Sequence, residues 1–436
     1  MTTIEQLYSL YLEHPAISTD SRSITPDSIF FALRGERFDG NQYALSAIEA
    51  GAAYAVVDDA SLVGERLLHV PNVLEALQAL AAHHRQALAT PVIAITGTNG
   101  KTTTKELAAA VLAKSYNLLY TEGNLNNHIG VPLTLLRLTS EHQIALIEMG
   151  ASKPGDIAEL CAIAQPNYGL ITNVGLAHLE GFGSLIGVIK TKGELYDWLR
   201  AHEGKIFLRE EDATLRDLGR GIPAVTYGQG EEAVVRGVLP EDNRELFLHF
   251  TWFCPTLQIA ECKQSTRLVG GYNLDNALAA IAMGLYFDVP VEDISQALAD
   301  YAPSNSRSQL IETEHNWLIA DAYNANPSSM HTALRNLVSL SVDRPRLLVL
   351  GDMNELGAES EAAHHKLRRE VEALLGEQDQ VLYCGPKWRQ ELGEVANSFL
   401  TREELAHWLE QHPPKGYLVL VKGSNGIGLG HILHLF

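Results

Sequence analysis

The residues best suited to phosphate chemistry form a short turn, which reads Gly-Thr-Asn-Gly-Lys-Thr-Thr from position 97. An apolar β-branched run at 92–95 predicts a buried strand before it, and an amphipathic pattern predicts a helix after Lys101. Such a turn directs backbone N–H groups at an anion, and the helix dipole adds positive potential. Lys101 would then reach the outer phosphates of a nucleotide, and the Thr102 hydroxyl would bind Mg²⁺. The candidate residues are Gly97, Thr98, Asn99, Gly100, Lys101, Thr102 and Thr103.

The spacing of this turn departs from the usual pattern GxxxxGK[ST], because Ile95 stands where that pattern has its first glycine. An ordinary strand-to-helix turn is therefore the alternative interpretation. The strand expected before the turn and the helix expected after it favour phosphate binding.

A second group of candidates follows the neighbouring predicted strands. Glu148 ends an apolar strand at 143–148, at the sheet edge where ligands bind, so it is a candidate Mg²⁺ ligand. His178 follows a strand at 168–174, and Lys192 lies in a predicted helix at 184–200. Taken alone, Glu148 could face water, His178 could be a structural loop residue and Lys192 could be solvated.

Amide side chains are concentrated in two places. Asn126, Asn127 and His128 follow a strand that ends at 120–121, and they suit polar substrate atoms, although a plain Asn-rich turn is the alternative. Asn273 and Asn276 stand three apart on one face of a helix and could bind an adenine edge. Asn273 could instead be only the helix cap.

Two further groups lie towards the ends of the chain. Asp321 lies at the carboxyl end of a strand expected at 317–322, and Tyr323 follows that strand. Arg307 precedes it as a candidate γ-phosphate clamp from another domain, or as a solvated residue. Near the N-terminus, the loop 34–41 carries Arg34, Arg37 and two glycines, and it could hold a diphosphate or a carboxylate. A solvated turn is the alternative there.

The elements that must position these residues predict an α/β protein of three domains. Residues 1–88 are expected to form a small α/β substrate domain, 89–303 a central P-loop domain with a mainly parallel sheet, and 304–436 a doubly wound, Rossmann-like domain. Within the central domain we expect a helix at 154–164 with Pro154 in its first turn. The short apolar runs in 223–265 predict an antiparallel appendage.

Composition narrows the classes of function. The net charge of −20 argues against a nucleic-acid or acidic membrane surface. The four cysteines show no CxxC or metal-type spacing, and the acidic N-terminus has no signal-peptide core, so we expect reduced thiols and a cytoplasmic location. No apolar run approaches the roughly 18 residues of a membrane-spanning helix.

Several stretches in this order carry a family resemblance: GTNGKTTTKE, GNLNNHIGVPLTLL, IEMGASKPGDIAEL, ITNVGLAHLEGFGS, YNLDNALAAIA, DAYNANPSSM and LGDMNELG. The chain resembles the Mur ligase family over essentially its whole length, and within it the branch that adds D-alanyl-D-alanine. The resemblance implies a monomeric, ATP-dependent amide-bond ligase. Its substrates would be UDP-N-acetylmuramoyl-tripeptide (UDP-MurNAc-tripeptide) and D-Ala-D-Ala, joined through an acyl phosphate.

The resemblance also implies roles for single residues. Thr102 and Glu148 would bind a first Mg²⁺, and His178 a second, together with Lys192 carbamylated by CO₂; Lys190 is the nearby competitor. The resemblance implies that Asn273 and Asn276 contact adenine, and that Arg307, Asp321 and Tyr323 contact ATP. In the first domain, the residues implied to contact the UDP-sugar are Ser21, Arg22, Arg34 and Asp39. One position departs from the family, because Asn425 replaces the arginine of the usual KGSR.

Three alternatives compete with this interpretation. The first is a sister ligase that adds a single amino acid, or a folylpolyglutamate synthase. The second is a P-loop regulator that hydrolyses ATP or GTP without ligation, although no NKxD motif for guanine is present. The third is a non-catalytic homologue, which would be expected to lose Lys101, Glu148, His178 or Lys192; all four are present.

Overall fold

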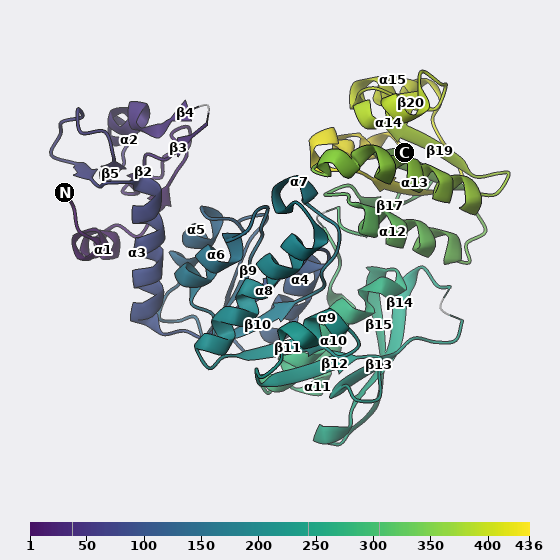
Figure 1. The fold of residues 1–436 in the computed structure, drawn as a ribbon, viewed down its shortest axis with the longest axis horizontal. Helices are drawn as coiled ribbons and strands as arrows, with labels where there is room; N and C mark the ends of the chain where they lie inside the picture. The colour runs from purple at the N-terminus through teal and green to yellow at the C-terminus, as the bar shows by residue number, and fades with distance from the viewer. Residues whose placement is uncertain (37, 243, 305) are drawn as a thin grey trace.

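The N-terminal unit is built on a small parallel sheet. The computed structural model describes residues 1–36, 38–242, 244–304 and 306–436. Strands β1 (Ile17–Ser18), β2 (Ile29–Phe31), β5 (Tyr54–Val57) and β6 (Leu67–His69) pair in that order, all parallel. Helices α1 (Ile4–Glu13) and α2 (Ala44–Glu49) and the hairpin β3–β4 (Arg34–Gly35, Phe38–Asp39) surround it. Figure 1 shows this unit set apart from the rest of the chain.

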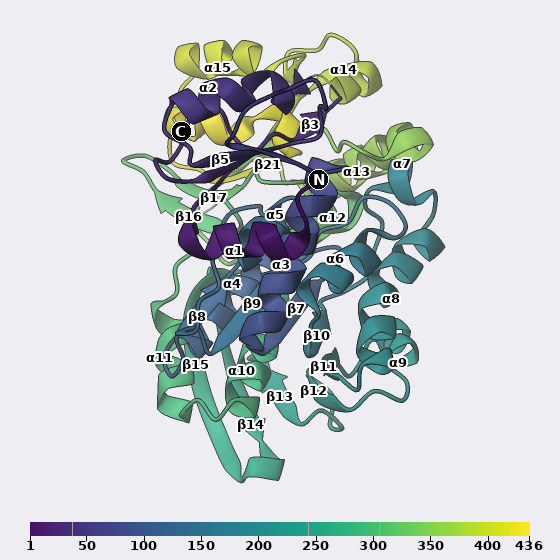
Figure 2. The same ribbon diagram turned by 90° about the vertical axis from the view of Figure 1, so that its left-hand side faces the viewer.

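Helix α3 (Val73–Leu88) joins this unit to the central one. Asn72 caps it, because its side chain accepts a hydrogen bond from the Glu75 backbone N–H. The helix packs on α5 (Gly130–Leu135) and α6 (Asp156–Ala164) of the central unit (Figure 2). The first sheet is therefore attached through a helix that belongs to the central hydrophobic core.

The central unit contains a nine-stranded sheet in the order β15-β14-β13-β12-β11-β10-β7-β9-β8. Strands β7 (Val92–Thr96), β8 (Leu118–Tyr120), β9 (Ile144–Glu148), β10 (Tyr168–Ile171) and β11 (Lys205–Arg209) run parallel, as predicted. Alternate residues of β7 face opposite layers. Val92 and Ala94 pack towards α3, α5, α6 and α8 (Leu185–Ala201), whereas Ile93 and Ile95 pack towards α4 (Lys101–Leu112), α10 (Leu274–Tyr286) and α11 (Val291–Asp300).

The expectation of an antiparallel appendage at 223–265 was wrong for its first half. Strands β12 (Ala224–Gly228) and β13 (Val235–Val238) extend the central sheet in parallel, after the short helix α9 (Ala213–Leu218). Among the described residues of this stretch, β14 (Phe247–Cys254) and β15 (Ile259–Val269) form the antiparallel part, and they continue the same sheet. Alternate residues of β14 are buried against the layer of α10 and α11, so these strands share the core of the unit.

The predicted start of α6 was also wrong, because Pro154 lies before the helix rather than in its first turn. Gly155, at φ 89°, occupies the N-cap position and the helix begins at Asp156. The Glu194 carboxylate, which comes from α8, accepts hydrogen bonds from the backbone N–H groups of Gly155 and Ala158. The N-terminus of α6 is thus capped by a side chain from another helix.

The C-terminal unit contains a six-stranded sheet in the order β16-β17-β21-β18-β19-β20. Its strands are β16 (Gln309–Glu312), β17 (Trp317–Asp321), β18 (Arg346–Gly351), β19 (Gln380–Cys384), β20 (Ser398–Phe399) and β21 (Leu418–Lys422). All neighbours pair in parallel except β16 with β17. Helices α12 (Pro327–Ser339), α13 (Ser360–Leu374) and α14 (Pro386–Leu392) cover one face, and α15 (Arg402–Gln411) covers the other.

The α/β class and the doubly wound C-terminal pattern are confirmed. We propose 1–88, 89–303 and 304–436 as the domains, since α3 ends at Leu88 and α11 ends at Asp300, before β16. The polar stretch 303–306 at this second boundary includes position 305, which lies outside the described residues. Within the described ranges, no helix is both long and apolar enough to cross a membrane.

Candidate active site

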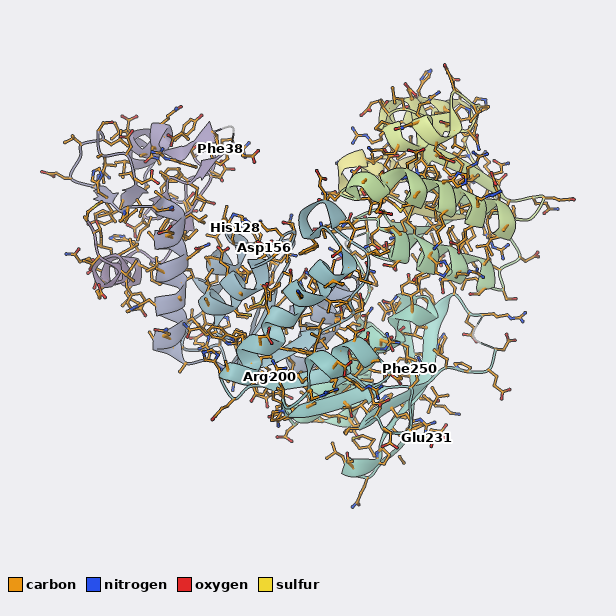
Figure 3. The ribbon with its side chains drawn as sticks, viewed as in Figure 1. Phe38, His128, Asp156, Arg200, Glu231 and Phe250 are labelled. Carbon is orange, nitrogen blue, oxygen red and sulfur yellow. The ribbon has the colours of Figure 1, made fainter. Side chains whose placement is uncertain are left out.

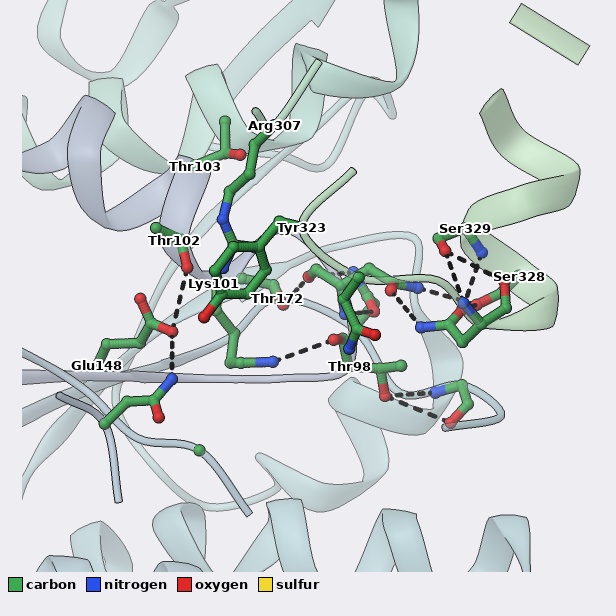
Figure 4. A pocket seen from close by; sticks show the side chains of 18 of the residues that line it. Thr98, Lys101, Thr102, Thr103, Glu148, Thr172, Arg307, Tyr323, Ser328 and Ser329 are labelled. Atoms are coloured by element: carbon green, nitrogen blue, oxygen red, sulfur yellow. Dashed lines mark hydrogen bonds between the residues drawn. The ribbon is translucent and has the colours of Figure 1, made fainter. Parts of the chain in front are cut away.

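A cavity of about 1000 Å³ lies where the central and C-terminal units meet. Its walls come from the turn before α4, the carboxyl ends of β9 and β10, the start of α10, and the segments around β17 (Figure 4). Among its lining residues are Asn99, Lys101, Glu148, His178 and Arg307. Most of the candidate residues predicted from the sequence therefore line one cavity.

The backbone of the phosphate loop adopts conformations that require glycine at two positions. Gly97 and Gly100 have φ angles of 141° and 78°, in the region that disfavours side chains, and a Cβ at Gly97 would overlap the Thr172 hydroxyl. The end of β10 holds the loop: the Thr172 Oγ1 donates to the Asn99 carbonyl at 2.6 Å, and the Asn99 N–H donates to Asn173 Oδ1 at 3.0 Å. The loop is preorganised by its neighbour in the sheet.

Lys101 begins α4 and folds back over the loop. Its Nζ donates to the carbonyls of Gly97 (2.7 Å) and Thr98 (3.1 Å). Burial lowers the pKa of this amine to about 8; Glu148 opposes that shift and Arg307 adds to it. The amine is thus still mostly cationic near neutral pH and suits a polyanionic ligand.

Glu148 is arranged as a metal ligand would be. One carboxylate oxygen, Oε1, accepts from Thr102 Oγ1 at 3.2 Å and from Asn126 Nδ2 at 2.8 Å. The other oxygen, Oε2, is buried and has no hydrogen-bond partner among the described residues. Mg²⁺ prefers hard oxygen ligands, so an orphaned carboxylate oxygen beside a threonine hydroxyl fits this ion.

The buried residues that hold Glu148 in place were not predicted from the sequence. Lys105, fully buried, donates from Nζ to the Thr121 carbonyl at 2.5 Å. The Thr121 hydroxyl in turn accepts from the Glu148 backbone N–H at 2.9 Å. The available signal was the second lysine of Lys-Thr-Thr-Thr-Lys, which falls on the buried face of the predicted helix.

His178 lines the cavity, whereas Lys192 is buried and is not among the lining residues. The His178 Nδ1 is 2.6 Å from Glu355 Oε2 of the C-terminal unit, and this hydrogen bond lowers the pKa of Glu355. Lys192 is 3% exposed, and burial, followed by the charge of Lys101, lowers its pKa to about 7. Its competitor Lys190 is exposed, so burial distinguishes the two lysines.

Asn273 and Asn276 line the cavity beside the phosphate loop. The Asn276 Nδ2 donates to Asn273 Oδ1 at 2.8 Å, and Asn276 Oδ1 accepts from Thr104 Oγ1 at 3.0 Å. Asn273 occupies the N-cap position of α10, but its side chain makes no cap hydrogen bond and instead donates to the Val269 carbonyl. The pair is fixed at the wall of the site.

The C-terminal unit supplies the opposite wall. The Arg307 guanidinium lies 3.6 Å from the centre of the Tyr323 ring, a cation–π contact. Asp321 Oδ2 accepts from Lys422 Nζ at 2.5 Å, and Lys422 is 3% exposed. All four side chains line the cavity, and Lys422 is one that sequence reasoning did not assign.

The predicted substrate residues divide into two groups. Asn126, Asn127 and His128 line the cavity, although Asn127 Oδ1 also accepts from the backbone N–H groups of Ile129 and Gly130. The residues of the first unit lie away from it. In Figure 3, Phe38 lies at the edge of the first unit that faces the central unit. His128 and Asp156 lie on the part of the central unit nearest to that edge.

In the first unit, charged partners already engage the candidate residues. Arg22 binds Asp20 through two nitrogens, and this contact lowers the pKa of Asp20 to about 2. Arg34 Nε is 2.9 Å from Asp58 Oδ1 and 3.5 Å from Asp39 Oδ1. Ser21 precedes Arg22 in a turn, and Arg37 lies outside the described residues. None of the four described candidates, Ser21, Arg22, Arg34 and Asp39, lines the cavity.

A glycine-rich phosphate loop at the carboxyl edge of a parallel sheet, covered by a second α/β unit, defines a nucleotide-binding protein of the P-loop class. Sequence models of three domains match the chain: "Mur ligase family, catalytic domain" at 15–85, "Mur ligase middle domain" at 95–284 and "Mur ligase, glutamate ligase domain" at 306–425. The chain belongs to the Mur ligase family, whose members are ATP-dependent ligases.

Named relatives agree on one branch of the family. The UDP-N-acetylmuramoyl-tripeptide–D-alanyl-D-alanine ligase of Bacillus subtilis (strain 168) is 35% identical, over 96% of this chain and 92% of its own length. The ligase of the same name from Escherichia coli (strain K12) is 38% identical, over 80% of this chain and 77% of its own.

Solved structures agree with these sequences. A crystal structure of MurF from Acinetobacter baumannii is 31% identical, with a TM-score of 0.85 over 96% of this chain and 92% of that one. MurF from Thermotoga maritima in complex with ADP is 26% identical, with a TM-score of 0.84 over 98% and 97%. The three-unit architecture is therefore shared from end to end.

Proposed function

We propose that this chain joins D-alanyl-D-alanine to UDP-MurNAc-tripeptide at the expense of ATP, and so makes the pentapeptide precursor of peptidoglycan. The observation that carries the proposal is the cavity itself, in which a phosphate loop, an acidic metal-type site and cations from a separate unit converge. The choice of substrates rests on relatives with this activity in their names, which match the chain over most of its length.

The chemistry explains why cations dominate the site. A carboxylate is a poor electrophile, so the terminal carboxylate of the tripeptide first attacks the γ-phosphorus of ATP, giving an acyl phosphate and ADP. The dipeptide amine then attacks the acyl carbon, and phosphate leaves from the tetrahedral intermediate. Lys101 and Arg307 both line the cavity and would stabilise the negative charge on the transferring phosphoryl group.

Two metal positions belong to the proposal. Thr102 and Glu148 would hold the first Mg²⁺, and the unpartnered Glu148 Oε2 supports that assignment. His178 and a carbamylated Lys192 would hold the second. Mg²⁺, when bound, neutralises charge on the phosphate oxygens. The protein's own contribution to the first position is to hold Glu148, whose backbone N–H donates to the Thr121 hydroxyl.

Carbamylation of Lys192 is supported by its surroundings. Its lowered pKa, about 7, leaves a large fraction of the amine neutral at physiological pH. The neutral nitrogen would attack the carbon of CO₂ and release one N–H proton to solvent, giving a carbamate. A buried cation would thereby become an oxygen ligand of negative charge.

The other sites complete the assignment. Asn273 and Asn276 would bind adenine, and Asp321 and Tyr323 would close over ATP beside Arg307. Asn126, Asn127 and His128 would contact the tripeptide end of the acceptor. The UDP-sugar end would bind the first unit, through Ser21, Arg22, Arg34 and Asp39. We also propose that the protein is a monomer, and its molar mass measured by light scattering tests this. We propose that it acts in the cytoplasm, where ATP is supplied.

The decisive experiment measures phosphate release from Mg²⁺ and ATP with UDP-MurNAc-tripeptide, with and without D-Ala-D-Ala. We expect sustained release only when both substrates are present, and a product whose mass equals the condensed pentapeptide. Turnover with a single amino acid in place of the dipeptide would assign the chain to a sister ligase. Hydrolysis of ATP that ignores both substrates would overturn ligation and leave a P-loop regulator.

A further inference from the structure

A carboxylate of the C-terminal unit reaches the histidine that lines the site in the central unit. His178 directly precedes α7 (Leu179–Phe182), and its Nδ1 is 2.6 Å from Oε2 of Glu355, in the loop after β18. The backbones also meet there, because the Glu180 N–H donates to the Glu355 carbonyl at 3.3 Å. Figure 1 shows α7 at the side of the central unit that adjoins the C-terminal unit.

Both residues of this pair have an unusual backbone. His178 has φ 50° and Glu355 has φ 62°, in the left-handed region that non-glycine residues rarely occupy. Such conformations are strained for residues with a side chain, and they persist where surrounding structure imposes them, often at functional sites. Two of them face each other across the boundary between the units.

The loop that carries Glu355 is fixed to its own unit. The Asp352 carboxylate accepts from the Trp388 backbone N–H at 3.0 Å. Two residues on, the Asn354 N–H donates to Ser424 Oγ at 2.8 Å. Glu355 is therefore held rigidly to the C-terminal sheet, and a movement of this unit away from the central one would withdraw it from His178.

The contact with Glu355 gives the two nitrogens of the His178 imidazole different roles. His178 lines the cavity and Glu355 does not. With Nδ1–H donating to the carboxylate, Nε2 is the nitrogen left to act as a ligand. A carboxylate that accepts from the outer nitrogen of a metal-binding histidine sets its tautomer and orientation.

We propose that Glu355 is a positioning residue for the ligase reaction, which orients His178 for metal binding when the C-terminal unit is docked. This inference rests on the proposed function, since it takes His178 as a metal ligand. It makes the second metal position depend on a residue from each unit. Metal binding and the closed arrangement of the two units would then support each other.

The contact can be removed without unfolding the protein. The side chains of His178 and Glu355 are 30% and 55% exposed, and pairs of that exposure contribute little to stability. Glu355→Ala removes the acceptor, whereas Glu355→Gln keeps an acceptor oxygen at the same reach. Glu361→Gln, an exposed position in α13, is the matched control for loss of one negative charge in this unit.

The first measurement is Mn²⁺ binding in the presence of a non-hydrolysable ATP analogue, followed by the electron paramagnetic resonance signal of free Mn²⁺. In E355A we expect the dissociation constant of one Mn²⁺ to rise about 10–100-fold. In E355Q it should stay within about threefold of wild type, and in E361Q it should not change. This readout needs no turnover, so it stands even if the substrates are not those proposed.

The second measurement is steady-state ligation with the same variants. We expect the kcat of E355A to fall about 10–100-fold while KM for ATP changes little, because the phosphate loop is untouched. Unchanged Mn²⁺ affinity in E355A would overturn the inference. An equal loss of Mn²⁺ affinity in E355Q and E355A would also overturn it. So would an increased radius of gyration in E355A with unchanged Mn²⁺ affinity, because Glu355 would then only hold the two units together.

Discussion

The Asn99 side-chain amide of the phosphate loop donates to the Ser328 hydroxyl at 2.9 Å, across 229 positions of sequence. A second contact closes the pair, because Asn326 Nδ2 donates to Asn99 Oδ1 at 2.8 Å. Asn326 also caps α12, by accepting from the Ser329 N–H. The loop expected to bind phosphates is thus tied directly to the N-terminus of a helix in the C-terminal unit (Figure 4).

This relationship predicts how closure contributes to catalysis. Ser328→Ala removes one of these hydrogen bonds, and Asn99→Ala removes both, each worth about 1 kcal/mol. We expect kcat/KM for ATP to fall about fivefold in S328A and about 10–30-fold in N99A. Ser339→Ala, at the exposed far end of α12, is the control and should match wild type. Equal efficiency of S328A and wild type would mean that closure does not depend on the contact.

Glu148 leads to a prediction in which stability and activity change in opposite directions. Its buried Oε2 has no partner among the described residues, so without metal the carboxylate is a buried, incompletely paired charge. Glu148→Gln removes that charge and should raise the thermal midpoint of the metal-free protein by a few degrees. Ligation should fall at least about 100-fold, because a neutral amide is a poor Mg²⁺ ligand.

The measurement is differential scanning calorimetry with and without Mg²⁺. Added Mg²⁺ should stabilise the wild type more than E148Q, which keeps only the second proposed metal position. A variant that is less stable than wild type without metal, and that gains as much stability from Mg²⁺ as the wild type does, would contradict the assignment of Glu148 as a ligand.

The sequence was sufficient for the parts of the site that local pattern encodes. A β-branched run, two glycines and an amphipathic helix specify the strand, loop and helix around Lys101, wherever the rest of the chain lies. The carboxyl-edge rule for parallel sheets then brought Glu148 and His178 to the same cavity. Such positions follow from the direction of strands and need no knowledge of distant contacts.

Residues that meet across long stretches of sequence left no comparable signal. Lys422 meets Asp321 across 101 positions, and Glu355 meets His178 from another unit, so neither pair has a helical or strand spacing that reveals it. The prediction for β12 and β13 failed for a related reason. Short apolar runs indicate that strands exist, but the runs alone do not show whether neighbouring strands pair parallel or antiparallel.

The environment of Lys192 predicts reversible uptake of CO₂. Only the neutral amine reacts, and burial lowers its pKa to about 7, so the neutral fraction grows as pH rises through that value. With ¹³C-bicarbonate we expect a carbamate resonance that strengthens from about pH 6 to about pH 8. Lys192→Ala should lack it and Lys190→Ala, the exposed neighbour, should keep it. A resonance that survives in K192A would place the carbamate on another lysine.

The departure from the family at Asn425 leads to the last prediction. Asn425 is exposed and does not line the cavity, whereas Lys422, three residues earlier, is buried and paired with Asp321. Asn425→Arg, which restores the family residue, should leave kcat/KM within about twofold of wild type. Lys422→Met should lower the thermal midpoint by a few degrees, because it leaves the partly buried Asp321 carboxylate without its cation.

The double variant Asp321→Asn/Lys422→Met separates the effect of the unpaired charge from the loss of packing. It should recover part of the lost thermal stability, since no carboxylate is then left without its cation, but not the ligation activity, since Asp321 lines the proposed active-site cavity. Thermal stability is measured by calorimetry, and ligation activity by phosphate release, on the same samples. A gain in activity in the N425R variant would instead show that the arginine of the family motif reaches the site, and that its absence here has a catalytic cost.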